Sequence, residues 1–123
     1  MTLSSVLIIV GRLLLGGYFF YSGMQNISKV ERHTGILAKK GVPMPRVAML
    51  VAVAAQLLGG ASVALGIFPA LGAAALLAFT VLATFLYLNF WTKQGEERTA
   101  QLNAFITNVA LIGAFLIVIA ISL

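Results

Sequence analysis

The segment LGIFPALG, residues 65–72, joins two long apolar runs at residues 47–68 and 71–91. It contains three residues that are typical of turns: Gly66, Pro69 and Gly72. Because the turn between the runs has room for only two or three residues, the runs must be antiparallel neighbours. Each run has about 20 residues, the length that a helix needs to cross the apolar core of a membrane.

Two further apolar runs, residues 3–26 and 102–123, lie outward of this pair. Of the 123 residues 61% are hydrophobic and 9% are charged, whereas a soluble domain has roughly 25% charged residues. The runs do not alternate polar and apolar residues as the strands of a membrane β-barrel do. We therefore predict an all-α integral membrane protein, in which residues 1–123 form one domain of four transmembrane helices in an antiparallel bundle.

A cleaved signal peptide would be an alternative explanation for the first apolar run. No basic residue precedes the run, and Arg12 interrupts its apolar sequence. Both features differ from those of a signal peptide. We therefore expect the first helix to be retained.

The formal net charge of +5 reflects basic residues in the two loops predicted at residues 27–46 and 92–101. The seven basic residues there are Lys29, Arg32, Lys39, Lys40, Arg46, Lys93 and Arg98. Both loops lie on one side of the membrane, and the opposite side has no Lys or Arg. The positive-inside rule places these loops in the cytoplasm and both termini outside. We expect the protein in a bacterial cytoplasmic (inner) membrane.

Two local patterns predict how the helices are arranged. In the first loop, Val30, Ile36 and Leu37 would share one side of a short helix at the membrane surface, with the basic residues facing anionic head groups. Small residues are dense in all four runs, and close packing over such residues drives helix association in lipid. In the second run they predict a packing ridge at four-residue steps: Gln56, Gly60 and Ala64.

Arg12 is a charge within an apolar run, about nine residues or roughly 14 Å from its start. A central arginine costs about 2.5–3.5 kcal/mol in a membrane helix. Either its side chain extends to the outer head groups, or it faces an acceptor on a protein or ligand. We predict that it faces the bundle interior or a partner. Gln56 is the best internal acceptor, because it lies roughly 14 Å from the opposite face.

Asn26 and Asn108 complete the intramembrane polar candidates, together with Arg12 and Gln56. They lie between Arg12 and the predicted cytoplasmic face. Two interpretations stay open. The four residues form a polar track, or they make only interhelical hydrogen bonds, which are typically worth under about 1 kcal/mol each.

The residue types that catalysis needs are scarce. The chain has no Cys and no Asp, and its three acids lie in the predicted loops: Glu31, Glu96 and Glu97. His33 is the only histidine, and we expect it to be solvated. One imidazole does not build a usual zinc or bis-histidine haem site. We predict no metal site and no nucleic-acid partner, and we do not expect this chain alone to be an enzyme.

Four segments together carry a family resemblance. They are GRLLLGGYFFYSGMQN at residues 11–26, KKGVPMP at 39–45, AQLLGGASVALGIFPALGA at 55–73 and TNVALIGAFL at 107–116. By their order and spacing the chain resembles the DoxX/DoxD-like family of small four-helix membrane proteins. Three positions depart from the family pattern. Gln56 replaces a common Glu, Asn26 an often found Lys, and Thr107 a Lys before the last-helix Asn.

The resemblance implies a functional setting. The family is named after a subunit of a thiosulfate:quinone oxidoreductase. Since this chain lacks redox-active residues, we expect a non-catalytic accessory subunit or partner of a larger, redox or quinone-linked membrane complex, or a homo-oligomer. The alternative is a carrier of a quinone, lipid or other small molecule, in which Arg12 holds an anionic or carbonyl-bearing ligand. A small exporter fits least, because such proteins depend on a membrane carboxylate.

Overall fold

The computed structural model describes residues 2–88 and 90–123, and these contain helices but no strand. The elements are α1 (Leu3–Ile27), α2 (Val30–Lys39), α3 (Pro45–Leu65), α4 (Pro69–Tyr87), the 3₁₀ helix η1 (Phe90–Thr92) and α5 (Gly95–Ser122). Four of them, α1, α3, α4 and α5, are long and apolar enough to cross a membrane. The predicted all-α membrane architecture with four spans is confirmed.

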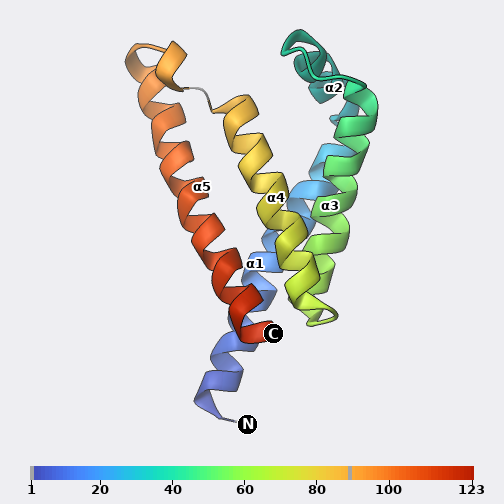
Figure 1. The fold of residues 1–123 in the computed structure, drawn as a ribbon, viewed down its shortest axis with the longest axis vertical. Coiled ribbons are helices and arrows are strands. Elements are labelled where there is room, and N and C mark those ends of the chain that lie inside the picture. The colour runs from blue at the N-terminus through green and yellow to red at the C-terminus, as the bar shows by residue number, and fades with distance from the viewer. Residues whose placement is uncertain (1, 89) are drawn as a thin grey trace.

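The four long helices are antiparallel along the chain, and each packs on the next in the order α1, α3, α4, α5 (Figure 1). One end of the molecule holds α2 and η1, and we call it the α2 end. The other end holds the α3–α4 turn, the start of α1 and the end of α5, and we call it the hairpin end. The first and last spans also meet, because the rings of Phe19 and Phe115 have centroids 5.2 Å apart.

The helix boundaries differ from prediction mainly at α5. This helix begins at Gly95 and not at residue 102, so the predicted loop at 92–101 is largely helical. Glu96 and Glu97 lie in the first turn of α5, where carboxylates are stabilised by the positive end of the helix dipole. The sequence predicts a loop here because these residues are charged. In the structure they extend the helix beyond its apolar part.

The turn that joins α3 to α4 agrees with its sequence. Gly66 ends α3 with a left-handed φ of 73°, a conformation that favours glycine. Pro69 begins α4, where its missing N–H leaves no hydrogen bond unmade. The two helices are therefore adjacent and antiparallel.

The predicted helix in the first loop is confirmed, and it packs on the bundle. Leu37 is buried in a cluster with Met49 and Val53 of α3, and Val30 packs against that cluster. Tyr87 from the end of α4 also contacts it. The apolar side of α2 thus covers protein, which places α2 over the ends of α3 and α4.

Two adjacent glycines let α3 approach two different helices. A β-carbon at Gly60 would lie 2.6 Å from the backbone nitrogen of Phe20 in α1. A β-carbon at Gly59 would lie 3.1 Å from the carbonyl oxygen of Gly72 in α4. The predicted ridge on α3 is confirmed, since Gln56, Gly60 and Ala64 all lie against glycines of α1.

Candidate functional site

Between α3 and α4 lies a cavity of about 600 Å³. The two helices are closest near their turn, where Gly59 approaches Gly72, and they separate toward the α2 end (Figure 1). Most of the cavity wall is apolar, with small and medium side chains of both helices such as Ala52, Ala55 and Leu82. Binding sites for small molecules are typically apolar cavities of this size with a few polar groups.

The polar side chains that line this cavity come from four different helices. They are Asn26 of α1, His33 of α2, Tyr87 of α4 and Asn108 of α5. Tyr87 ends α4, and His33 lies in α2, so this polar part faces the α2 end. The cavity is therefore amphipathic, with an apolar body between α3 and α4 and a polar rim.

Two hydrogen bonds orient the amides beside the cavity. The Nδ2 of Asn26 donates to the Oε1 of Gln56 over 2.8 Å, and Gln56 is buried. The Nδ2 of Asn108 donates to the Oγ1 of Thr84 over 2.9 Å, and that hydroxyl donates to the carbonyl oxygen of Thr80. Each asparagine keeps its Oδ1 acceptor and a second N–H, so a ligand can be both donor and acceptor here.

His33 and Tyr87 form a contact between α2 and α4. Their rings are edge to face with centroids 5.9 Å apart, and the Tyr87 hydroxyl lies 3.4 Å from His33 Nδ1. The expectation that His33 is solvated was wrong, because its side chain is half-buried where α2 packs against Tyr87 at the end of α4. Burial lowers the pKa of His33 below its usual 6.5, and the nearby charges of Arg32 and Lys29 lower it further.

This lowered pKa predicts how stability depends on pH. The unfolded chain binds a proton at His33 more readily than the folded chain does, so we expect thermal stability to fall as the pH drops below about 6.5. His33→Gln removes the only histidine and should flatten this dependence. Melting temperatures of both proteins between about pH 7.5 and about pH 5 test it. An equal slope for His33→Gln would show that His33 is not responsible.

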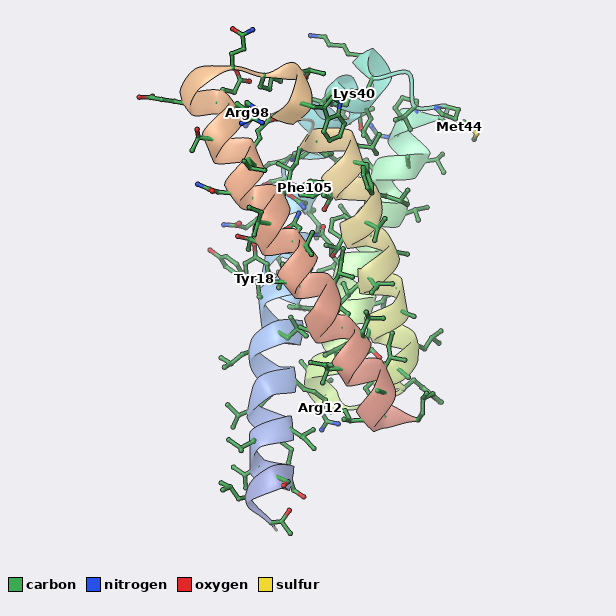
Figure 2. All side chains as sticks on the ribbon, turned by 60° about the vertical axis from the view of Figure 1, so that its left-hand side comes forward. Arg12, Tyr18, Lys40, Met44, Arg98 and Phe105 are labelled. Carbon is green, nitrogen blue, oxygen red and sulfur yellow. The ribbon has the colours of Figure 1, made fainter. Side chains whose placement is uncertain are left out.

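The candidate residues from the sequence divide into two groups. The structure brings Asn26 and Gln56 together by a hydrogen bond, and Asn108 lines the same cavity. Arg12 is separate from them and does not line the cavity. Its guanidinium lies against Gly66 at the hairpin end, where a β-carbon would be 3.0 Å from Nη2, and Figure 2 shows it directed away from the α2 end.

The predicted hydrogen bond from Arg12 to Gln56 is wrong. Gln56 precedes Gly66 by ten residues, which is about 15 Å along α3. The prediction counts the depth of Arg12 from one membrane face and the depth of Gln56 from the other, and it assumes that all helices span the same thickness. In the structure α1 extends past the α3–α4 turn (Figure 1), which moves Arg12 to the level of that turn.

Sequence reasoning missed three residues at the site: His33, Tyr87 and Thr84. For Thr84 a signal existed, because Thr80 and Thr84 are four residues apart and share one face of α4. Both are buried. For His33 and Tyr87 no local pattern is decisive, since their contact joins segments 54 residues apart.

A comparison with protein families found one model, DoxX, which matches residues 7–89. This chain belongs to the DoxX family. The matched range contains most of α1 and all of α2 to α4, and thus every residue that lines the cavity except Asn108. The resemblance noted at residues 107–116 lies outside the matched part of this DoxX-family chain. No curated protein and no solved structure matched it.

Proposed function

We propose that this DoxX-family protein binds an amphipathic molecule of the quinone class in the α3–α4 cavity, as a non-catalytic accessory subunit of a larger membrane complex. The observation that carries this proposal is the amphipathic cavity. Its apolar walls suit a hydrocarbon tail. At its polar rim, Asn26, Asn108 and Tyr87 offer N–H and O–H donors, which suit the carbonyl oxygens of a quinone.

The length of the available groove supports a ligand with a long tail. A second cavity of about 560 Å³ continues along α3 and α4 to their turn. The two cavities share Val51, Ala55 and Ala75. A head group at the polar rim would thus leave its tail in an apolar groove that runs toward the hairpin end.

In this proposal the protein binds the quinone and does not change it chemically. Among the described residues that line the first cavity, His33 and Tyr87 are the titratable ones. The chain contributes neither a thiol nor an aspartate anywhere. Electron transfer would therefore belong to the partner subunits, and this chain would position the quinone for them.

Polar side chains on the outside of α5 favour the accessory role. Asn103 and Thr107 are exposed, and the Thr107 hydroxyl donates to the Asn103 carbonyl oxygen over 3.0 Å. Asn103 lies at the start of the predicted span at 102–123, so its exposed amide is open to a partner at the edge of the membrane. A helix of another subunit would find a hydrogen-bonding group there.

We also propose an orientation. The α2 end holds seven basic residues, and the hairpin end holds Arg12. The positive-inside rule then places the α2 end in the cytoplasm of a bacterium, with the protein in the inner membrane. The quinone head would lie in the cytoplasmic half of the bilayer.

A binding experiment tests the proposed function. We expect purified protein to bind a short-chain benzoquinone analogue saturably, and Asn108→Leu to weaken binding about three- to tenfold, as loss of one hydrogen bond predicts. Thr84 keeps its bond to Thr80 in this variant. Asn103→Leu, outside the cavity on the same helix, is the control and should bind normally. Absence of saturable binding by the unmodified protein would refute the proposal.

A further inference from the structure

The hairpin end carries a single basic side chain in an unusual setting. The Arg12 guanidinium lies over the backbone of Gly66, where a β-carbon would be 3.0–3.3 Å from three of its atoms. Its Nε is buried and has no hydrogen-bond partner. Arg12 forms no hydrogen bond and no ion pair with any part of the chain that the structure describes. Its charge is therefore held against protein without being balanced there.

The acidic side chains of the chain lie at the opposite end of the molecule. Glu31 is in the first turn of α2 and pairs with Arg46. Glu96 and Glu97 are in the first turn of α5. A second copy of the chain in the same orientation would place its three acids equally far from Arg12. The acidic side chains of this chain, or of a second copy in the same orientation, therefore do not supply the counter-charge for Arg12.

The surroundings of Arg12 indicate which molecule supplies the counter-charge. Leu13 of α1 and Ile67 and Phe68 of the turn are exposed and apolar, so in a membrane they contact acyl chains. At this level α3 ends and α4 begins, so a head group here lies at the end of two spans, although α1 continues past it (Figure 1). An anion that also carries acyl chains fits both the guanidinium and these apolar side chains.

We propose that Arg12 and the α3–α4 turn bind the phosphate of an anionic phospholipid. The guanidinium offers parallel N–H donors that match phosphate oxygens in a bidentate arrangement. Gly66 has no side chain, which leaves room for the flat guanidinium against the turn. Neither cavity is lined by Arg12. Ile67 and Phe68 also line the second cavity, so the two proposed sites meet at the turn, but the phosphate contact at Arg12 does not depend on a bound quinone.

Lipid-dependent stability tests this site. We expect phosphatidylglycerol added to detergent-purified protein to raise the melting temperature by several degrees more than phosphatidylcholine does. Arg12→Gln should remove this difference. Lys39→Gln, which removes an exposed cation at the α2 end, should keep it. Inorganic phosphate alone should have no effect, because the acyl chains are part of the ligand.

Several outcomes would overturn the proposal. One is an equal phosphatidylglycerol effect in Arg12→Gln, and another is an equal effect of inorganic phosphate. A third is loss of a co-purifying protein in Arg12→Gln with lipid stabilisation unchanged, which would assign Arg12 to a partner carboxylate. If Arg12→Gln does not fold, photoreactive phosphatidylglycerol can be crosslinked to the unmodified protein. Crosslinks at residues 9–16 or 66–68 support the site, and crosslinks confined to the α2 end overturn it.

Discussion

Adding one methyl group at Gly16 should force α1 away from α3, whereas the same change at Gly17 should be tolerated. A β-carbon at Gly16 would lie 2.5 Å from the backbone nitrogen of Ala64 and would also contact the carbonyl oxygen of Gly60. A β-carbon at Gly17 would have nothing within 4 Å. Backbone atoms of a packed helix cannot move aside as a side-chain end can, so the two helices must separate.

The expected difference between the two variants is large. Overpacking costs typically about 1–3 kcal/mol, and we place Gly16→Ala at the upper end of this range. Gly17→Ala should be neutral or stabilising by up to about 1 kcal/mol, because alanine favours the helix. Thermal unfolding in one detergent, followed by circular dichroism, measures both. Equal melting temperatures would show that α1 and α3 do not pack through these glycines.

Filling the groove at Ala75 should abolish ligand binding, and filling space at Ala74 should not. Ala75 lines both cavities, so a phenylalanine there would occupy the place where they join. Ala74 is the preceding residue on α4, is exposed and lines neither cavity. We expect Ala75→Phe to weaken binding of a long-tailed quinone at least tenfold, or by about 1.4 kcal/mol. Ala74→Phe should bind as the unmodified protein does.

The length of the ligand tail sharpens this second test. A tailless benzoquinone needs only the polar rim, so Ala75→Phe should affect it less than the long-tailed compound. Binding of both compounds to both variants can be measured by equilibrium titration. If Ala75→Phe binds the long-tailed quinone normally, the tail does not lie between α3 and α4.

The fold was largely predictable because its main determinants are local. Apolar runs give the spans, and the short turn around Pro69 requires α3 and α4 to be antiparallel neighbours. The ridge at Gln56, Gly60 and Ala64 was also predictable from four-residue spacing. The start of α5 was not predictable, because the charged residues before residue 102 have the composition of a loop although they are helical.

The site was less predictable because it depends on register and on divergence between helices. The contact of Gly16 with Gly60 sets the level of Arg12 relative to α3. Counting residues from each membrane face gives no information about this contact. The cavity depends on where α3 and α4 separate. The contact between His33 and Tyr87 depends on how α2 packs over the ends of α3 and α4. No short sequence pattern specifies this packing.

The position of the closest α3–α4 contact has a mechanical consequence. Gly59 meets Gly72 near the turn, whereas Tyr87 lies 15 residues further along α4, or about 22 Å away. Rotating α4 by about 5° around this contact would move its far end by about 2 Å over that distance. The rim at His33 and Tyr87 would widen while the packing beside the turn hardly changed. The entrance can thus change its width without loss of the contact between Gly59 and Gly72.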